Sequence, residues 1–514
     1  MDGLSTNGFN IANTSRMSSM FEHGLPYSTK MRAHSSCINA LAFSSQGGRF
    51  LASGGDDLQI HIWDFHQEEA TAEPCHTFRG PRNNIFCLEF SSHNQYLFAG
   101  GTDNIVHQFD VSRLESGSLN RNEQLPTALF REDDTIRDVT CHPFHDEVFL
   151  SGSDNGRIIQ HDSRIKHSTN PTPRAADIIQ LVTEVTSVKF HPTVDHLFAT
   201  SDSKGNVCLR DTRMAFGPRK GRTKNGIVRT FHTTISRPNV ETMSSPEPSS
   251  LAFDRQGEKL AVTLLHYYPT IYSLSDSHPI AICTGRNTVE GKSLGQRTYS
   301  NSCTMKHGCF GSPGLVSGDD YYCSGSDNFC AYLWKIPSVE HLVEERKEIS
   351  SHEWQLSKGN TVAFTAGLES PKFIPTEIST PSAILKGHNS IVNTTLIHPY
   401  FPLILTAGIE RTVTLHSPLP SCPFSQQLSL TPQEVRQLPN DTTIEEARVI
   451  DSLLLGLSDP ADRNSPDEAE LDTIRLFDRI LRIEGEADPF DVRPWYQVSA
   501  EQTSDSDSDI LESD

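Results

Sequence analysis

The sequence of 514 residues lacks several features that would place it in a familiar class. No stretch of 18 apolar residues occurs, so we expect no transmembrane helix. The N-terminus has no apolar segment behind a basic start, so we expect no secretory signal. The 11 cysteines form no C-x-x-C pair and no Cys/His spacing of a zinc site. An odd number of cysteines without a signal fits a reducing compartment, and we expect the nucleus and the cytoplasm.

Basic residues are scarce. The chain has 44 Lys and Arg against 65 Asp and Glu, which gives a formal net charge of −21. A general nucleic-acid binder needs a basic face to neutralise phosphates, so we expect no direct contact with nucleic acid and none with a membrane. The local exception is RKGRTKNGIVR at residues 219–229. This run is interpreted as a solvated loop, with a nuclear-localisation patch as the alternative.

Signatures of catalysis are missing too. The sequence has no G-x-S-x-G, and GRNTVEGKS at 285–293 places five residues between Gly285 and Gly291, where a phosphate loop needs four. HPFHDE at 142–147 is typical of a turn between strands rather than of a metal site. We therefore expect a protein that is not an enzyme and that uses no cofactor and no metal.

What the sequence does contain is a repeat of short strands. Residues 33–65 hold three alternating segments, INALAF, RFLASG and IHIWDF, separated by the polar turns SSQGG and GDD. Such a pattern predicts antiparallel strands in a meander. The first-strand signature returns in six later segments: IFCLEF (85–90), IRDVTC (136–141), VTSVKF (185–190), SSLAF (249–253), NSCTM (301–305) and IVNTTL (391–396).

Seven units of this kind resemble the WD-repeat propeller family, whose blades are four-stranded sheets. We therefore predict an all-β, seven-bladed WD-repeat β-propeller with a C-terminal helical and acidic extension. LPYSTKM at 25–31 is expected to supply the outer strand of the last blade, because an open ring would leave edge strands unpaired.

The predicted organisation has a propeller at its centre and less regular segments around it. In chain order we expect a disordered N-terminal tail (1–24), the propeller (25–418) with loop-like inserts at 214–245 and 337–382, a helical extension (419–497) and an acidic disordered tail (498–514). Within the extension, 443–457 and 468–483 show helical spacing, and the second is expected to dock on the propeller. The apolar residues near one face of this second helix are Leu471, Ile474, Phe477, Ile480 and Leu481.

In a complete repeat of that family, a His, a Ser, an Asp and a Trp form a buried hydrogen-bonded set, and His34, Ser53, Asp57 and Trp63 fit these positions. A buried indole N–H needs an acceptor, which gives the set a structural role. The same role is expected in other blades for Asp103, Trp334 and His388. Other blades carry a different residue where Trp is expected: Phe109, His161, Arg210 and His416. We expect these blades to rely more on apolar packing.

The tripeptide Asp-x-Arg closes a third strand twice, in IIQHDSR (158–164) and in VCLRDTR (207–213). The turns after third strands lie on one flat face of a propeller, so the two guanidinium groups would lie side by side in neighbouring blades. A guanidinium is a rigid fork of donors for carboxylates and carbonyls, and Arg is enriched at interface hot spots. The alternative is structural: the Asp caps its own turn and the Arg packs on the next blade.

The two stretches resemble the tandem W-D-x-R boxes of the substrate receptors of the cullin-4 ubiquitin ligase, with His161 and Arg210 in place of Trp. NIFCLEF, YSNSCTMKHGCF, SGSDNFCAYLWKIP, LKGHNSIVN and the closing SDSDSD resemble the fifth numbered type of cullin-4-associated factor, so the chain resembles a divergent or fungal-like relative. The resemblance implies that four residues contact the adaptor subunit, a protein of the damaged-DNA-binding type, and through it cullin-4: Asp162, Arg164, Asp211 and Arg213.

The resemblance also implies a non-catalytic receptor that recruits an unknown protein substrate for ubiquitination. The alternative is a WD-repeat scaffold in another nuclear complex, such as one for chromatin or RNA processing. A small-molecule binder or an enzyme in the central channel is the third reading. In the acidic tail, Ser504 and Ser506 are candidate phosphorylation sites, because an acid follows each of them three residues later. The alternative for that segment is a solvating acidic tail.

Overall fold

The computed structural model describes most of the chain. The described residues are 20–45, 47–66, 73–114, 125–165, 173–238, 240–292, 298–312, 318–425, 428–438, 466–485 and 488–490. The expected helix at 443–457, the tail at 498–514 and both Ser504 and Ser506 lie outside these residues. In the described part of the chain, no helix is both long enough and apolar enough to cross a membrane.

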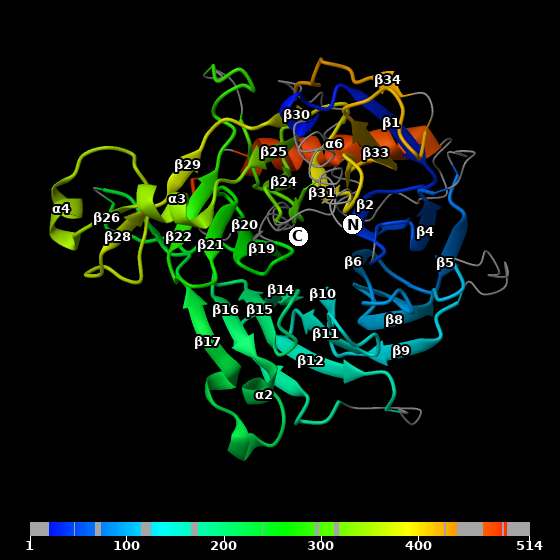
Figure 1. The fold of residues 1–514 in the computed structure, drawn as a ribbon, viewed down its shortest axis with the longest axis horizontal. Helices are drawn as coiled ribbons and strands as arrows, with labels where there is room; N and C mark the ends of the chain where they lie inside the picture. Colours follow the sequence, from blue (N-terminus) through cyan, green and yellow to red (C-terminus); the bar gives the residue numbers. More distant parts are fainter. Residues whose placement is uncertain are drawn as a thin grey trace, which may run out of the picture.

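Seven antiparallel sheets form a ring around a central channel, as the repeats predict (Figure 1). Blades one and two are β2(Ile38–Phe43), β3(Phe50–Gly55), β4(Gln59–Asp64), β5(His76–Arg79), and β6(Ile85–Phe90), β7(Tyr96–Gly101), β8(Ile105–Asp110), β9(Ala128–Arg131). Blades three and four are β10(Ile136–Cys141), β11(Val148–Ser153), β12(Arg157–Asp162), β13(Ile178–Gln180), and β14(Val185–Phe190), β15(Leu197–Asp202), β16(Val207–Asp211), β17(Ile227–Phe231).

Blades five to seven are less regular in their outer parts. Blade five is β19(Pro248–Phe253), β20(Lys259–Leu264), β21(Thr270–Ser273) and β22(Pro279–Cys283), with β29(Thr376–Ile378) added in parallel to β22. Blade six is β23(Cys309–Gly311), β24(Tyr321–Gly325), β25(Ala331–Lys335) and β30(Ala383–Leu385). Its first strand is therefore not NSCTM (301–305), as was expected from the sequence, because residues 302–304 form bends before β23. Blade seven is β31(Val392–Ile397), β32(Ile404–Gly408), β33(Thr412–Ser417) and β1(Tyr27–Arg32), extended by β34(Ser429–Leu430).

The ring closes between the two ends of the propeller. Strand β1 pairs antiparallel with β33, in a register that runs from Tyr27 opposite Ser417 to Arg32 opposite Thr412. The outer strand of the last blade therefore comes from residues 27–32, as the sequence predicts. This pairing covers the edge that β33 would otherwise leave unpaired, which is the physical reason for the arrangement.

The core of the molecule lies between neighbouring blades rather than at one centre. One cluster of buried side chains joins blades one and two and includes Ala52, Ile60, Leu88 and Leu97. Another joins blades seven and one and includes Leu51, Trp63 and Leu405. Each strand sends alternate side chains to the two faces of its sheet, so every blade buries apolar residues on both sides.

The expectation of a loop-like insert at 337–382 is wrong. This segment contains α3(Val339–Glu345), β26(Lys347–Ile349), α4(Ser351–Leu356), β27(Ala363–Phe364), β28(Lys372–Ile374) and β29. With β18(Ile235–Ser236), three of its strands form an eighth sheet of order β18-β27-β28-β26, which lies outside the ring beside blade five (Figure 1). The buried Trp354 donates its indole N–H to Ser236 Oγ at 3.1 Å and fixes α4 to this sheet. Strands of two or three residues are too short to show an alternating pattern, which is why the sequence did not reveal them.

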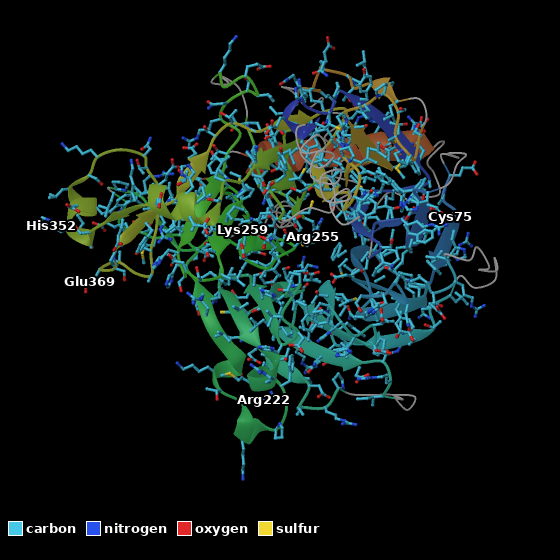
Figure 2. The ribbon with its side chains drawn as sticks, in the orientation of Figure 1. Cys75, Arg222, Arg255, Lys259, His352 and Glu369 are labelled. Carbon is cyan, nitrogen blue, oxygen red and sulfur yellow. The ribbon has the colours of Figure 1, made fainter. Side chains whose placement is uncertain are left out.

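The expectation of a loop-like insert at 214–245 is also wrong. Residues 212–215 form the short helix α2(Thr212–Ala215), followed by the 3-10 turns η1(Arg219–Gly221) and η2(Lys224–Gly226), and then by β17 and β18. In the basic run, Arg222 donates hydrogen bonds to the carbonyl oxygens of Gly217, Ile178 and Ala175, and it lies beside α2 (Figure 2). Arg222 therefore links this segment to β13 of blade three, so part of the run is not a solvated loop.

Both ends of the described chain pack on the propeller. Phe21 lies within the segment expected to be a disordered tail (1–24), yet its side chain is fully buried and its ring contacts Tyr321 edge-on at 5.2 Å. The expected C-terminal helix is present as α6(Pro466–Glu484) and lies across the disc near blades six, seven and one (Figure 1). The expected apolar stripe is only partly buried, since Ile474 and Leu481 are buried whereas Leu471 is exposed.

Candidate functional site

In four successive blades, an aspartate at the end of the third strand accepts the backbone N–H two residues later, and in blade four this aspartate caps helix α2. In blades three and four, Asp162 Oδ1 accepts the backbone N–H of Arg164 at 3.0 Å and Asp211 Oδ1 accepts that of Arg213 at 2.9 Å. In blades one and two, Asp64 and Asp110 accept the N–H two residues later in the same way, at 2.9 and 3.0 Å. The aspartate therefore supports the turn itself, whatever residue comes after it.

Only blades three and four place an arginine at the end of this turn. The Nε of Arg164 donates to Asp162 Oδ1 at 2.9 Å and its Nη2 donates to Oδ2 at 2.7 Å. The corresponding distances from Arg213 to Asp211 are 3.0 and 2.7 Å. These bidentate hydrogen bonds lower the pKa of both aspartates, although partial burial opposes the change. Each guanidinium is thus held in one orientation by its own turn.

Both guanidinium groups face the solvent. The exposed fraction of the side chain is 61% for Arg164 and 68% for Arg213. Among the described residues, the hydrogen bonds of these two guanidinium groups go only to Asp162 and Asp211. Half of the structural alternative therefore holds, since the aspartates cap their turns, but the arginines do not pack on the next blade.

The two turns lie on the same face of neighbouring blades. The N–H of Ser163 donates to Glu147 O and the N–H of Thr212 donates to His196 O, at 2.9 and 2.8 Å. Each turn therefore lies beside the loop that joins the first and second strands of its own blade. We call the face formed by these loops and turns the arginine face.

Loops of the sequence type His-Pro lie next to the arginines on this face. His142 Nδ1 accepts the N–H of Phe144 at 3.1 Å, and His191 Nδ1 accepts the N–H of Val194 at 3.0 Å. Burial lowers the pKa of both histidines, which keeps their rings neutral and able to accept. HPFHDE is therefore a turn, as the sequence indicates, and it presents the half-exposed ring of Phe144 beside the blade-three turn.

The structural set of blade one is complete. His34 Nδ1 lies 2.9 Å from Asp57 Oδ2, His34 Nε2 lies 2.8 Å from Ser53 Oγ, and the indole N–H of Trp63 donates to Ser53 Oγ at 3.0 Å. His34, Asp57 and His61 also have ligand atoms within 4.8 Å of one another. Both ring nitrogens of His34 lie within hydrogen-bond distance of Asp57 and Ser53, which fits the structural role that the sequence predicts.

The other proposed network residues make different contacts. Asp103 Oδ2 lies 2.8 Å from His107 Nε2 and accepts the N–H of Arg82. The indole N–H of Trp334 donates to Thr284 O at 3.1 Å, and thus not to the second strand of its own blade. His388 lies 2.6 Å from Glu410 Oε2 and 2.7 Å from Thr406 Oγ1, which reproduces the blade-one arrangement in blade seven.

Apolar packing does not replace the missing tryptophans in three of the four blades. His416 Nε2 lies 2.9 Å from Thr406 Oγ1 in blade seven, and His161 Nε2 lies 2.8 Å from Ser151 Oγ in blade three, where Glu132 completes the set. In blade four, Arg210 Nε donates to Thr200 Oγ1 at 2.9 Å. The expectation holds for Phe109 alone, because each of the other three side chains has a nitrogen within hydrogen-bond distance of a second-strand hydroxyl.

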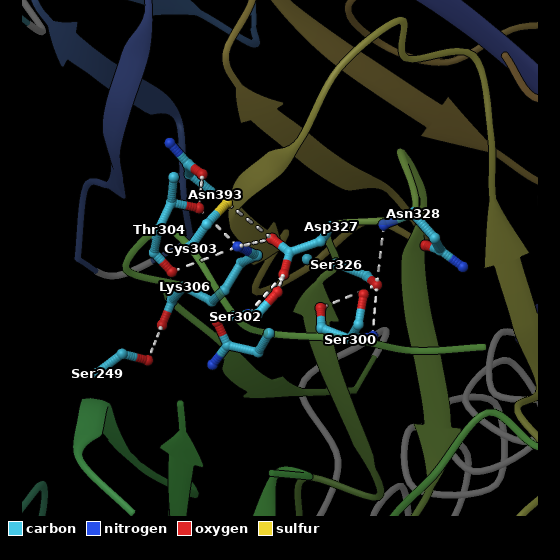
Figure 3. A network of polar contacts seen from close by, with 12 residues as sticks. Ser249, Ser300, Ser302, Cys303, Thr304, Lys306, Ser326, Asp327, Asn328 and Asn393 are labelled. Carbon is cyan, nitrogen blue, oxygen red and sulfur yellow. Dashed lines mark hydrogen bonds and ion pairs between the residues drawn. The ribbon is translucent and has the colours of Figure 1, made fainter. Parts of the chain in front are cut away.

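Sequence reasoning missed a buried ion pair in blade six. Lys306 Nζ lies 2.5 Å from Asp327 Oδ1, and both side chains are fully buried (Figure 3). Lys306 also donates to Thr304 Oγ1, and Asp327 accepts the N–H and the hydroxyl of Ser302. The two residues are 21 positions apart, and this separation matches no helix or strand periodicity. The one signal in the sequence is a Lys in a stretch that otherwise carries no charge.

The central channel contains a cavity of about 730 Å³ that the first strands line. Lys189 Nζ lies 2.9 Å from Asp138 Oδ1 and 3.2 Å from Glu89 Oε2 in its wall. Arg255, which Figure 2 labels near the centre of the ring, lines the same cavity. The charges are paired across blades, so this cluster stabilises the ring.

Comparisons with known proteins agree with the fold. The family described as WD domain, G-beta repeat matches residues 26–64 and 72–110, which are the first two repeats. The chain is 28% identical over 401 residues to DDB1- and CUL4-associated factor 5 of mouse and of human, which covers 77% of this chain and 34% of each relative. It is 25% identical over 264 residues to human DDB1- and CUL4-associated factor 6, which covers 50% of this chain and 29% of that protein. The chain thus spans about a third of the length of its curated relatives. The chain folds as a seven-bladed β-propeller whose first two repeats match the family described as WD domain, G-beta repeat, and it is similar over most of its length to DDB1- and CUL4-associated factor 5.

Proposed function

We propose that this protein is a non-catalytic substrate receptor of a cullin-4 ubiquitin ligase. Its relatives are named for their association with DDB1 and CUL4, and the match to the fifth factor covers 77% of this chain. The observation that carries the proposal is the pair of exposed guanidinium groups, Arg164 and Arg213, at equivalent turns of neighbouring blades.

The geometry of these turns favours docking on a protein surface. Asp162 and Asp211 fix the two arginines before any partner arrives, so little side-chain entropy is lost on binding. A fixed guanidinium with free N–H groups donates well to carbonyl or carboxylate oxygens of a partner. We propose that this partner is the adaptor DDB1, and that CUL4 joins through it.

In this proposal the protein performs no chemistry of its own. It raises the effective concentration of a protein substrate beside the ligase's conjugating enzyme. The adaptor occupies the arginine face, so the substrate binds elsewhere on the chain.

The test is affinity capture with DDB1 and CUL4 as the readout, comparing wild type with Arg164→Ala/Arg213→Ala. The matched control is Arg49→Ala. Arg49 also donates two hydrogen bonds to a turn aspartate, from Nε to Asp64 Oδ1 at 3.2 Å and from Nη2 to Asp64 Oδ2 at 2.9 Å. It belongs to blade one, so it tests whether any arginine held by such an aspartate would serve.

We expect wild type and Arg49→Ala to capture DDB1 and CUL4, and the double variant to lose both while its thermal unfolding is unchanged. If the wild-type chain captures neither protein, the receptor proposal fails, and a scaffold role in another nuclear complex becomes the better account. If the double variant still captures DDB1, the receptor role stands and the docking site lies elsewhere.

A further inference from the structure

Helix α6 lies on the face of the propeller opposite to the arginine face. It contacts Arg411, in the turn between β32 and β33, and Phe329, in the turn between β24 and β25. Turns between second and third strands lie at the opposite end of each blade from turns that follow third strands. The face that carries α6, which we call the helix face, therefore stays open when a partner covers the arginine face.

Two arginines outside α6 bind its acidic residues: Arg411 belongs to blade seven, and Arg436 belongs to the segment that follows β34. Arg411 donates its backbone N–H and its Nε to Glu470 at 3.0 Å each, and its Nη2 contacts Asp467 at 2.6 Å. Arg436 donates to both carboxylate oxygens of Asp478 at 2.8 and 2.6 Å. The charges on the two sides are thus complementary.

Apolar side chains complete the contact. Leu481 is buried against Cys37, Phe329, Ile391 and Ile409. Ile474 is also buried. The residues of α6 that face the propeller are therefore Asp467, Glu470, Ile474, Asp478 and Leu481, whose spacing of three, four, four and three places them on one face of a helix.

Helix α6 fills this surface only in part. One cavity of about 740 Å³ lies on its blade-seven side, between residues such as Lys30, Thr412 and Leu471. A second cavity of about 880 Å³ lies near its C-terminal end, between residues such as Tyr332, Lys386 and Arg482. The ion pairs are partly exposed, with 89% of Asp467 and 24% of Glu470 accessible, so solvent weakens them.

We propose that the surface under α6 is a binding site for an acidic amphipathic helix of a partner protein. In the free chain α6 occupies this site, and the partner helix binds there by displacing α6. Arg411 and Arg436 recognise two acidic residues eight positions apart, and the apolar pocket of Phe329, Ile391 and Ile409 receives the aliphatic residue three positions after the second acid. The expected motif of the partner helix copies the spacing of Glu470, Ile474, Asp478 and Leu481. An acidic residue is followed by an aliphatic residue four positions later, by a second acidic residue four positions after that, and by a second aliphatic residue three positions further on.

A partner helix can displace α6 because it can make more contacts. As part of the same chain, α6 competes at a high effective concentration, so a partner with equal contacts would lose. A longer or bulkier helix would also fill the two cavities that α6 leaves. The proposal goes beyond ligase assembly, since it concerns the opposite face of the disc.

The experiment measures binding of a fluorescent peptide with the sequence of residues 466–484 to the full-length chain by anisotropy. Glu470→Lys/Asp478→Lys detaches α6 without altering the propeller surface. We expect this released chain to bind the peptide at least about tenfold more tightly than wild type does, because the site is empty. Ile474→Glu is a second way to release α6 and should give the same result.

Two controls define the site. In the released chain, Arg411→Gln/Arg436→Gln should abolish peptide binding, whereas Arg222→Gln, remote in blade four, should leave it unchanged. A scrambled peptide of the same composition should not bind. The proposal is overturned if both released chains keep a cooperative thermal transition yet bind no peptide, or if the scrambled peptide binds equally well.

Discussion

Blades one and two differ from blades three and four in the residue that stands two positions after the aspartate at the end of the third strand. All four turns are closed by an aspartate that accepts a backbone N–H at 2.9–3.0 Å. The residue that donates this N–H is His66 or Ser112 in the first pair and Arg164 or Arg213 in the second. The turn therefore forms without arginine. Because the fold does not require Arg164 and Arg213, their exposed guanidinium groups are free to serve a partner.

Blades five and seven extend this comparison. Ser273 Oγ accepts the N–H of Ser275 at 3.3 Å, and Ser417 Oγ accepts the N–H of Leu419 at 3.1 Å. A serine hydroxyl thus does what the aspartate does, but more weakly. An aspartate can also hold a guanidinium by two hydrogen bonds, which a hydroxyl cannot do.

The largest expected effect concerns the arginines themselves. Arg164→Ala and Arg213→Ala should each weaken binding to purified DDB1 by about 30-fold, the size typical of an interface hot spot, and the double variant by more than about 100-fold. The matched pair His66→Ala and Ser112→Ala should leave the dissociation constant unchanged. Titration calorimetry measures the dissociation constants of all five variants. Equal losses in both pairs would remove the distinction between the blades.

A second prediction concerns the third-strand position where blade seven has His416 and blade two has Phe109. Burial lowers the pKa of His416 to about 3, whereas an unfolded histidine titrates near 6.5. Between these two values the unfolded chain binds one proton more than the folded chain. The free energy of unfolding therefore falls as the pH is lowered from about 6.5 toward 3, by up to about 1.4 kcal/mol per pH unit.

The variant His416→Phe, which copies blade two, should remove this contribution. Between pH 7 and pH 5 the free energy of unfolding should fall in both proteins. The decrease should be about 2 kcal/mol smaller in the variant than in wild type. Urea denaturation at several pH values measures this. Glu410, whose pKa the hydrogen bond from His388 lowers to about 2 against the opposing effect of burial, gives a separate loss below about pH 4.5 in both proteins. Identical pH profiles down to pH 5 would contradict the prediction.

The third prediction tests whether the four aspartates are equivalent in the fold. Asp64→Ala, Asp110→Ala, Asp162→Ala and Asp211→Ala should each lower the free energy of unfolding by about 1 kcal/mol, because each leaves a turn N–H without its acceptor. Only the last two should also weaken DDB1 binding, since only they orient Arg164 and Arg213. A stability loss confined to blades three and four would show that those turns are structurally special.

The smallest effect is expected from adding an arginine to blade two. Ser112→Arg should change the free energy of unfolding by less than about 0.5 kcal/mol, because the new side chain is exposed and Asp110 is in place to hold it. DDB1 binding should not change, since a partner that fits blades three and four does not reach blade two. A gain in affinity measured by calorimetry would mean that the docking surface extends further around the disc.

Features that depend on a few consecutive residues were predictable. The alternating strands of the first repeat, the closing strand at residues 27–32 and the helix that became α6 all follow from periodicity within one segment. The Asp-x-Arg turns were found for the same reason, since an aspartate acts on an N–H two residues away. Their exposure could not be predicted, because it depends on which neighbouring loops leave room.

Features that depend on distant residues were not predictable. In the sequence, His161, Arg210 and His416 stand where tryptophan is expected, although each places a side-chain nitrogen within hydrogen-bond distance of a second-strand hydroxyl. The side sheet joins Ile235–Ser236 to strands more than 100 positions later. Such short strands carry no periodic signal of their own.

By itself, the sequence determined the number of blades and the position of each polar turn, because short-range hydrogen bonds and alternating apolar residues set both. Only the tertiary structure decided where buried charge is paired and which surface is occupied. Lys306 reaches Asp327, and Arg411 and Arg436 reach α6, because the ring brings those groups together. A charge in the interior is stable only beside its partner, and that partner is chosen by the geometry of the whole ring.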